Sequence, residues 1–463
     1  MPRIGSSKSK TGCTTCKVRR VKCTEERPEC RRCTTTGRRC EYSLDNTHHT
    51  DRRHDKTSLS SNPCSVTSTP ERRAFEFYFH AAAPGLSGVL DLSFWRGTVL
   101  QICRSEPAIW DAINSLSVLY EDGLNPRGIQ WYLRSLAVFQ EKIARGTIEL
   151  GVALVSCALF VAIEVLQGNF SSSLVLFHQG VQLIGSVLSS SSSSSSSSMV
   201  SSTVETVAPV LLRMGTLPLI AAGPLTQKIQ HQHIPVSFTS IAEARMALYS
   251  IVQEVRGSVS RKRKKDKNSK ETLEEQIYRL LCWHQQFLSL PALPDPEYAS
   301  VVSTILMTYL SAWIWVNNHN NTASEEGYDQ YIPQFKQIIA HAATALSESC
   351  PLPQSPFVFE MGVGLSLFIT AIKCRDASLR RQAIEYLSLA PKVQGMYRCE
   401  AAREIAEKIV DLEENGRRVC DFMILQGDNT RLRCFLAGCE REILLSDHHS
   451  YQEYHLVSVY YHG

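Results

Sequence analysis

The sequence predicts two folded parts joined by a polar linker: a small metal-stabilised module near the N-terminus and a large all-α domain after it. Six cysteines lie between Cys13 and Cys40 with the spacing C-x2-C-x6-C-x6-C-x2-C-x6-C. Residues 43–70 hold almost no large apolar side chains, which is typical of a solvated linker. From about residue 71, apolar residues recur with helical periodicity, and 463 residues at 43% hydrophobic content can bury a substantial core.

The cysteine segment is one C-x2-C-x6-C unit written twice, with an offset of 17 residues. Zinc in structural sites takes four ligands in a tetrahedron. Two ions therefore need eight zinc–sulfur bonds, and six thiolates supply eight only if two of them bridge both ions. Symmetry favours equivalent positions as bridges; the spacing does not select the pair, although the first cysteine of each half lies where a shared ligand would link the halves. The candidate zinc ligands are Cys13, Cys16, Cys23, Cys30, Cys33 and Cys40.

The region around these cysteines is strongly basic. Residues 1–40 contain 12 Lys+Arg and 3 Asp+Glu, a side-chain charge of +9, which two zinc ions and six thiolates change to about +7. Residues 41–463 contain 37 basic and 42 acidic side chains, a charge of −5, and the two parts sum to the formal +4 of the chain. Such a concentration of positive charge favours binding to the phosphates of nucleic acid. We expect a short helix over Lys17–Lys22 that places several cations on one surface and fits a DNA major groove.

The cysteine spacing, this basic segment and Pro28 in the loop between the halves resemble the fungal Zn2Cys6 binuclear cluster transcription factors. The resemblance implies that Cys13 and Cys30 bridge the two zinc ions. It also implies binding of double-stranded DNA, with a CGG triplet read by a lysine at the position where this chain has Arg20. Arginine can pair with the O6 and N7 of guanine but differs from lysine in reach and geometry, so we expect a CGG-like site.

Contacts with bases and contacts with phosphates are expected from different cations. Base or near-base contacts are assigned to Arg20 and Lys22. Phosphate contacts, which set the register of a protein on DNA, are assigned to Lys17, Arg19, Arg38 and Arg39.

Other interpretations of the cysteines fit the sequence less well. A secreted disulfide framework conflicts with the N-terminus Met1–Ser6, which has no apolar signal segment. A metal-storage module would not need a cationic helix, and a RING-type module uses longer ligand gaps and commonly histidine. The linker residues His48, His49 and His54 are expected to bind no metal, because six cysteines already complete the ligand shell.

Residues 71–445 are expected to form an all-α domain, because alternating strand patterns are scarce there. Ile129, Leu133, Leu136 and Ile143 make one apolar stripe on a helix. Aromatic residues such as Tyr309, Trp313 and Trp315 are assigned to the core, with a small-molecule pocket as the alternative. Similar stripes occur in residues 106–121, 148–167, 174–188, 241–255, 273–289, 300–316, 334–347, 357–373 and 396–413.

Three segments within this domain resemble the helical fungal-specific regulatory domain of filamentous-ascomycete zinc-cluster regulators: Ile109–Leu116, Cys157–Asn169 and Phe177–Ile184. The resemblance covers about residues 71–440 and implies that the domain controls the activity of the DNA-binding module. Residues 446–463 form a tail that matches no feature of that family.

Two polar inserts are expected to be disordered loops. The first, near residues 189–202, contains an unbroken serine tract. The second, near residues 257–270, contains a cationic run that is compatible with a nuclear import signal, a solvated loop or a second DNA contact. The run begins with Arg261, Lys262, Arg263, Lys264 and Lys265.

The flanks of the cluster complete the predicted domain organisation. Residues 1–12 are expected to be a disordered basic arm, and residues 41–70 a flexible linker. Many members of the resembled family carry a coiled coil after the cluster, but no heptad repeat is found here. The chain is therefore expected to act as a monomer or to dimerise through its C-terminal region.

The predicted function is zinc-dependent, sequence-specific DNA binding that regulates RNA polymerase II transcription in the nucleus, with coregulators as further partners. No phosphate loop, dinucleotide fingerprint, G-x-S-x-G elbow or H-E-x-x-H motif indicates an enzyme. No transmembrane segment is expected, since the apolar run 152–163 is shorter than a bilayer requires. The alternative is a zinc-stabilised nuclear scaffold or corepressor that acts through protein contacts of the helical domain.

Overall fold

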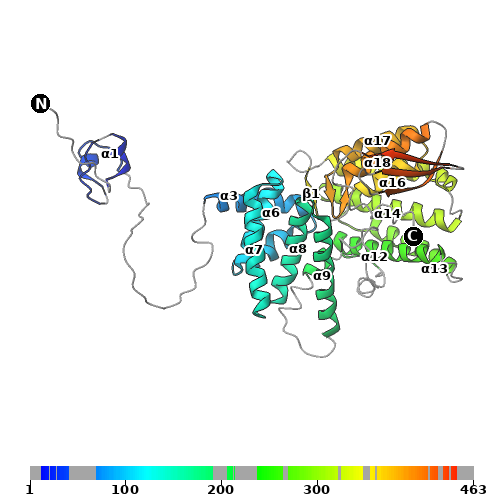
Figure 1. Ribbon diagram of the computed structural model, residues 1–463, viewed down its shortest axis with the longest axis horizontal. Helices are drawn as coiled ribbons and strands as arrows, with labels where there is room; N and C mark the ends of the chain where they lie inside the picture. The colour runs from blue at the N-terminus through cyan, green and yellow to red at the C-terminus, as the bar shows by residue number, and fades with distance from the viewer. Residues whose placement is uncertain are drawn as a thin grey trace. The chain divides into compact units, whose positions relative to one another are not determined.

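The fold is described from a computed structural model of the chain (Figure 1). The chain divides into two compact units, Met1–Ser60 and Ser61–Gly463, and each is described by itself. The basic arm, most of the linker and the C-terminal tail predicted from the sequence lie outside the described residues. The structure describes residues 12–19, 21–27, 29–40, 69–190, 206–211, 213, 237–263, 269–321, 325–347, 355–359, 362–414, 418–425, 431–436 and 439–445.

The small unit contains two short helices, α1 (Thr14–Val18) and α2 (Arg31–Thr34). The helix expected over Lys17–Lys22 was wrong in its bounds, since α1 begins earlier and ends at Val18. A hydrogen bond of 3.1 Å from the Val21 N–H to the Cys16 carbonyl closes the helix. Residues 21–26 are not helical, and this segment brings Cys23 to the cluster.

The first half of the large unit is helical throughout its described residues, apart from the turns between helices. Its helix α8 is buried at every position from Val152 to Ile163, so the most apolar run of the sequence forms a core helix. The elements are α3 (Thr69–Phe77), a π-helix η2 (Tyr78–Ala82), α4 (Ala83–Ser87), a π-helix η3 (Phe94–Thr98), α5 (Val99–Cys103), α6 (Pro107–Asp122), α7 (Pro126–Ala144), α8 (Leu150–Leu166) and α9 (Phe170–Ser190).

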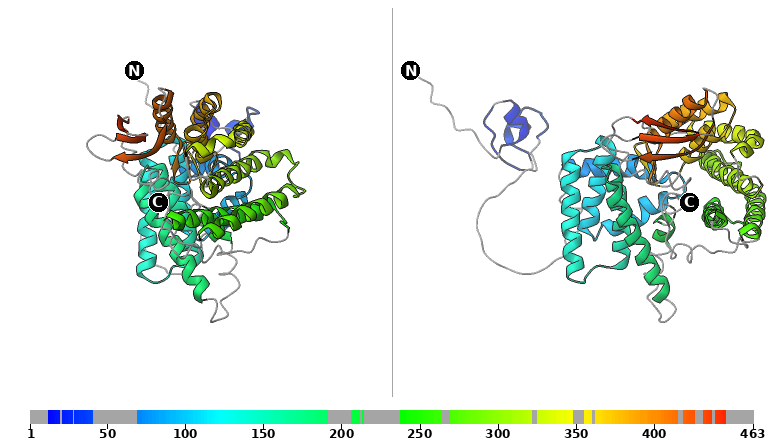
Figure 2. Two further views of the ribbon diagram at one scale, coloured as in Figure 1. Left: turned by 90° about the vertical axis from the view of Figure 1, so that its right-hand side faces the viewer. Right: turned by 45° about the vertical axis from the view of Figure 1, so that its right-hand side comes forward.

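The second half combines further helices with two small sheets. Figure 2 shows the last three strands beside α17 and α18. Its helical elements are α12 (Ile241–Arg263), α13 (Ser269–Leu288), η4 (Pro296–Tyr298), α14 (Ala299–Asn321), η5 (Glu326–Tyr331), α15 (Ile332–Ser347), α16 (Gly364–Lys373), α17 (Ala377–Leu389) and α18 (Cys399–Glu414). Its strands are β1 (Phe357–Val358), β2 (Val393–Gln394), β3 (Tyr397–Arg398), β4 (Val419–Leu425), β5 (Arg431–Leu436) and β6 (Cys439–Leu444).

The strands are the main departure from the predicted all-α domain. Strand β1 pairs in parallel with β2, which pairs antiparallel with β3, and β4, β5 and β6 form an antiparallel meander. The helix expected over 357–373 therefore begins only at Gly364, because Phe357 and Val358 pair with β2. Helix α17 was not expected either. The prediction of a large and mainly helical domain is nevertheless confirmed.

The stripe predicted on α7 is only partly buried, since Ile129 and Leu136 pack against the core. Leu133 and Ile143 are 59% and 53% exposed. The buried residues of α7 are Gly128, Trp131, Tyr132 and Ser135. The predicted stripe therefore contributes to the core in part, because bulky aromatics and small residues on the neighbouring face pack more closely against α6 and α8.

The aromatic residues assigned to the core are packed, as expected. Tyr309 is 5% exposed and stacks on Trp283 at 5.6 Å between ring centroids. Trp313 and Trp315 are partly buried against the same core. The segment Pro296–His319, which contains most of α14, is long and apolar enough to cross a membrane by length and composition alone. It packs against α12, α13 and α15, and 56% of its apolar window is buried inside the protein.

Some residues of the two predicted inserts belong to helices. Helix α9 continues to Ser190, and α12 continues through residues 257–263. Arginine and lysine are good helix formers, so a cationic run can extend a helix that has already formed. The serine tract from 191 onward and residues 264–268 lie outside the described residues.

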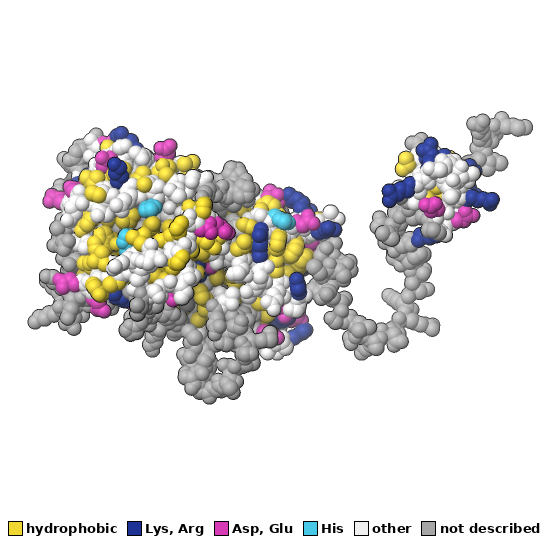
Figure 3. Space-filling model, turned by 180° about the vertical axis from the view of Figure 1, so that it is seen from behind, with side chains coloured by type: hydrophobic (Ala, Val, Ile, Leu, Met, Phe, Trp, Pro, Cys, Tyr) yellow, Lys and Arg dark blue, Asp and Glu magenta, His cyan; other side chains and the backbone are white. Residues whose placement is uncertain are grey.

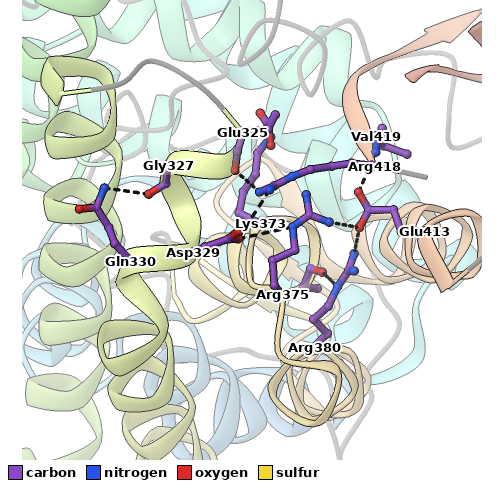
Figure 4. Close-up of polar contacts among 11 residues, drawn as sticks. Glu325, Gly327, Asp329, Gln330, Lys373, Arg375, Arg380, Glu413, Arg418 and Val419 are labelled. Carbon is purple, nitrogen blue, oxygen red and sulfur yellow. Dashed lines mark hydrogen bonds and ion pairs between the residues drawn. The ribbon is translucent and has the colours of Figure 1, made fainter. Parts of the chain in front are cut away.

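Ionic contacts join the meander to the helices beneath it (Figure 4). Glu413 at the end of α18 is only 3% exposed and lies 3.1 Å from Arg375 and 2.6 Å from Arg380. Its other carboxylate oxygen accepts a 2.8 Å hydrogen bond from the Val419 N–H at the start of β4. Arg418 donates to the Glu325 carbonyl. One buried carboxylate therefore connects α17, α18 and β4.

Candidate metal centre

The six cysteines gather in the small unit around its two helices. Cys13 and Cys30 stand at the N-caps of α1 and α2, in extended conformation, and each turns the chain into a helix whose first turn carries the next cysteine. Five of the six side chains are buried, with Cys23 the most exposed of them at 7%, and Cys40 is partly buried. Short helices with inward sulfurs therefore replace an apolar core.

The sulfur atoms form two groups of four, and both groups contain Cys13 and Cys30. Within each group all sulfurs lie within 4.8 Å of one another. Two tetrahedra that share one edge need this arrangement, with the shared pair as bridging ligands. The geometry selects Cys13 and Cys30, the pair that the family resemblance implied. The groups are Cys13, Cys16, Cys23, Cys30 and Cys13, Cys30, Cys33, Cys40.

The distances between sulfurs fit zinc. A zinc–sulfur bond of about 2.3 Å in a regular tetrahedron places ligand sulfurs about 3.8 Å apart. The Cys13 and Cys30 sulfurs are 3.6 Å apart, and the distances from Cys13 to Cys33 and from Cys16 to Cys30 are both 3.7 Å. A disulfide would require about 2.05 Å. The residues present therefore fit a binuclear zinc cluster, and the disulfide alternative is excluded for them.

The two halves repeat their backbone hydrogen bonds at the offset of 17 residues. The Cys13 N–H donates to the Cys23 sulfur at 3.4 Å, and the Cys30 N–H donates to the Cys40 sulfur at 3.2 Å. The hydrogen bond from the Val21 N–H to the Cys16 carbonyl is matched by a 3.0 Å hydrogen bond from the Arg38 N–H to the Cys33 carbonyl. The sequence repeat is thus a structural two-fold repeat.

Six sulfurs this close together cannot all ionise without a cation. Burial and the neighbouring Cys13 and Cys30 sulfurs raise the pKa of Cys16 to about 12. Burial opposes ionisation of Cys30 as well, but hydrogen bonds from the Cys33 backbone and adjacent sulfurs lower its pKa to about 6. Zinc supplies the positive charge that holds all six as thiolates, so its binding displaces protons and supplies folding free energy.

The cations predicted to contact DNA occupy different positions around the cluster. Lys17 is exposed on α1, whereas Lys22 is exposed in the segment that follows. Arg19, at the C-cap of α1, is partly buried and donates to the Thr36 hydroxyl at 3.3 Å, which links the two halves. Arg38 and Arg39 are exposed after α2. Arg20 lies outside the described residues.

Two exposed arginines were not predicted as candidates from the sequence. Arg31 and Arg32 open α2, directly after the N-cap cysteine Cys30. The 17-residue repeat places Arg31 and Arg32 at the positions of Thr14 and Thr15, at the start of the second helix as those residues are at the start of α1. The repeat could therefore have indicated them. Exposed cations therefore lie on both halves.

The cationic run proposed for nuclear import lies far along the chain from this unit. Arg261, Lys262 and Arg263 form the last residues of α12. Lys264 and Lys265 lie outside the described residues.

Residues 11–48 match the fungal Zn(2)-Cys(6) binuclear cluster domain. The chain is 58% identical over 40 residues, 9% of its length, to the aspercryptin biosynthesis cluster-specific transcription regulator atnN of Emericella nidulans, covering 7% of that protein. It is 30% identical over 135 residues, 27% of its length, to the Zn(2)-C6 fungal-type transcription factor afumD of Aspergillus fumigatus, covering 36% of it. It is 50% identical over 40 residues, 9% of its length, to the transcriptional regulatory protein moc3 of Schizosaccharomyces pombe, covering 8% of it.

These similarities cover well under two thirds of each relative. No solved structure matches the chain. The relatives are transcription regulators, which are not enzymes. The sulfur geometry and the domain match agree on the same six ligands, so residues 11–48 of this chain form a fungal Zn(2)-Cys(6) binuclear cluster domain.

Proposed function

We propose that this protein is a zinc-dependent, sequence-specific DNA-binding regulator of RNA polymerase II transcription that acts in the nucleus. The observation that carries the proposal is the pair of four-sulfur groups sharing Cys13 and Cys30, surrounded by exposed cations. A metal-held module of this size is rigid without a core, and its charge suits the phosphates of DNA.

The base-reading role is assigned to Arg20 and Lys22, and the site is CGG-like. Exposed Lys22 lies in the non-helical segment between α1 and Cys23, close to the cluster that fixes the backbone. Guanine in the major groove presents two acceptors that an arginine or lysine can contact.

The phosphate-binding role is assigned to exposed cations on both halves of the unit. They include Lys17 and Arg38, which the sequence predicts, and Arg31 and Arg32, which are exposed in the structure. Arg19 and Arg39 remain in the assignment, although Arg19 also links the halves through Thr36. Such contacts position a protein on DNA without reading its sequence.

The large helical unit is assigned the role of a regulatory domain that controls the activity of the DNA-binding module. Its support is the resemblance of segments in α6, α8 and α9 to the fungal-specific regulatory domain. The cationic residues 261–265 are proposed as a nuclear import signal, and deletion of these residues should reduce nuclear accumulation of a reporter fusion.

Selection from a random duplex DNA pool tests the proposal. The zinc-loaded full chain should enrich a G-rich motif, and chelation should abolish enrichment. Binding to the selected site should weaken steeply as salt rises. Recovery of no motif, with only weak and indiscriminate attraction to DNA, would reject the DNA-reading function and favour the scaffold alternative.

Single substitutions separate the two kinds of contact. Arg20→Ala should relax the preference at one base position, at a cost of about 1–3 kcal/mol on the preferred site. Lys17→Ala should weaken binding equally on all sequences and reduce the salt slope by about 1. An equal loss on all sequences for Arg20→Ala would remove its base-reading role.

A further inference from the structure

The two halves of the small unit touch each other at equivalent positions of the repeat. The offset of 17 residues makes Cys30 the equivalent of Cys13, and their sulfurs are 3.6 Å apart. The same offset makes Thr36 the equivalent of Arg19, and Arg19 Nη1 donates to the Thr36 hydroxyl at 3.3 Å. The halves are therefore related by an approximate two-fold axis that passes between both pairs. We call the hydrogen bond between Arg19 and Thr36 the cross-half contact.

The bridging sulfurs alone hold the two halves together along a single edge. Two tetrahedra that share two ligands can hinge about the line joining those ligands, and zinc has no electronic preference that would oppose a change of angle. A contact away from the shared edge is needed to stop this motion. Cys13 and Cys30 are the N-caps of α1 and α2, whereas the cross-half contact lies at the other end of both helices. It is therefore placed where it can fix the angle between the halves.

The Thr36 hydroxyl is oriented to accept the hydrogen bond from Arg19. Its proton is directed at the carbonyls of Arg32 and Cys33, at 2.7 and 3.2 Å, so a lone pair remains for the guanidinium. A hydrogen bond from a charged donor is stronger than one between neutral groups. The repeat is asymmetric at this position, and two arginines here would repel each other. Arg19 is partly buried, which also restricts its side chain.

A second hydrogen bond joins the same side of α1 to the second half. The Thr15 hydroxyl donates to the Arg39 carbonyl at 2.9 Å. The Arg19 N–H donates to the Thr15 carbonyl at 3.2 Å, so the two residues lie one helical turn apart on one face. Helix α1 is thus attached to the second half at two points along its length, and rotation about either point is opposed by the other.

The residues assigned to base reading follow the cross-half contact directly in the chain. Arg20 is adjacent to Arg19, and exposed Lys22 precedes the zinc ligand Cys23. A side chain that reads a base must be held within about 0.5 Å of its productive position. Phosphate contacts are spread over many cations, and Figure 3 shows Lys and Arg side chains around the outline of the small unit. A change in the angle between the halves should therefore disturb base reading more than phosphate binding.

We propose that Arg19 is a positioning residue, whose hydrogen bond to Thr36 fixes the angle between the two halves and so sets how sharply the protein discriminates between DNA sequences. This inference rests on the proposed function and assigns a specificity-determining contact to the same DNA-reading surface. The role differs from that of a phosphate contact, which changes the affinity for all sequences equally. Thr36 carries no charge, so its part in the contact can be removed without removing a cation.

The substitution Thr36→Val tests the proposal in the zinc-loaded full chain. The measurement is the ratio of affinities for the selected duplex and for a scrambled duplex, repeated at several salt concentrations. The ratio should fall at least about 5-fold, the low end of what one good base contact provides. The salt slope should not change, because every cation is retained. Elemental analysis should give the zinc content of the wild type.

The matched control is Thr35→Val, one residue earlier. The Thr35 hydroxyl donates to the Arg31 carbonyl four residues before it, as the Thr36 hydroxyl does to Arg32. Both substitutions therefore remove the same local hydrogen bond and the same hydroxyl, but only Thr36→Val removes the cross-half contact. Thr35→Val should keep the affinity ratio of the wild type.

A double-variant cycle separates positioning from phosphate binding by Arg19. Arg19→Ala should lower the affinity ratio and also reduce the salt slope by about 1, because it removes a cation. Adding Thr36→Val to Arg19→Ala should lower the ratio no further, since the contact is already broken.

The outcomes distinguish failure of this inference from failure of the proposed function. A wild type that prefers a sequence, together with an unchanged ratio in Thr36→Val, would overturn the positioning role alone. Equal losses in Thr36→Val and Thr35→Val, additive losses in the double variant, or loss of zinc from Thr36→Val would overturn it as well. A wild type with no sequence preference would reject the proposed function and this role with it.

Discussion

The small and large units of this protein are stabilised by different forces. Among the described residues of the small unit, the buried cluster consists of cysteines with Val21 packed against it, so the zinc–thiolate bonds take the place of a hydrophobic core. The large unit has a continuous core that runs from α3 to the β4–β6 meander. Because the two sets of interactions are separate, the zinc-held fold should be able to unfold while the helical unit stays folded.

Removal of zinc should have the largest effect, and this effect should be confined to the small unit. Structural zinc in small domains supplies about 10–16 kcal/mol of binding free energy at neutral pH, and that free energy is the folding free energy. A chelator should therefore unfold residues 12–40 and leave the helical unit folded. Hydrogen exchange measured before and after chelation checks both outcomes in one sample. Loss of protection in both units would show that they fold as one.

Substitution of a bridging ligand should cost more than substitution of a terminal one. Cys13 belongs to both four-sulfur groups, whereas Cys16 belongs to one. Cys13→Ser should reduce binding of both zinc ions, and Cys16→Ser should spare the ion held by the other group. Elemental analysis of the purified variants gives the zinc content. Equal zinc loss in the two variants would contradict the bridging assignment.

Loss of the buried carboxylate of Glu413 should destabilise the large unit with no effect on zinc content. Glu413→Ala leaves Arg375, Arg380 and the Val419 N–H without this acceptor, and breaking a buried pair in this way costs about 3–5 kcal/mol. Urea unfolding followed by circular dichroism measures the change. The control Glu442→Ala removes an exposed pair with Arg433 and should cost under about 1 kcal/mol. Similar losses in both variants would mean that Glu413 has no special role.

Acidification should weaken the large unit slightly. Burial lowers the pKa of His284 and of His341 below the usual value of 6.5. The unfolded chain then binds more protons than the folded one below about pH 6.5, so the stability from these groups is present above that pH and is lost as the pH falls. Unfolding of His284→Phe at pH 7 and pH 5.5 should show a smaller pH dependence than the wild type. An unchanged dependence would exclude His284.

The metal centre could be predicted almost completely because its information is local. The 17-residue offset between Cys13 and Cys30 sets both the ligands and the two-fold hydrogen bonds of the cluster. The bounds of α1 were missed, since the return of Cys23 to the cluster ends that helix earlier than the basic segment suggests. Arg31 and Arg32 were not predicted because the longer basic run of the first half gives the stronger signal.

The mainly helical fold of the large unit could be predicted from the sequence, but the packing of its elements could not. Apolar stripes in the sequence predicted α6, α8, α9 and α12–α15. Strands β4–β6 were not predicted, although Leu432, Cys434 and Leu436 alternate with more exposed residues. A strand of six residues gives a weak signal, and its pairing depends on residues that are distant in the chain.

The zinc ligands, the concentration of positive charge at the N-terminus and the mainly helical character of the rest follow from the sequence alone, because spacing and periodicity express them directly. The tertiary structure was needed to show that Leu133 and Ile143 of the α7 stripe are exposed and that Glu413 joins α18 to β4. The physical reason is that an apolar side chain is buried only if another element reaches it, and which elements meet depends on the packing of the whole unit.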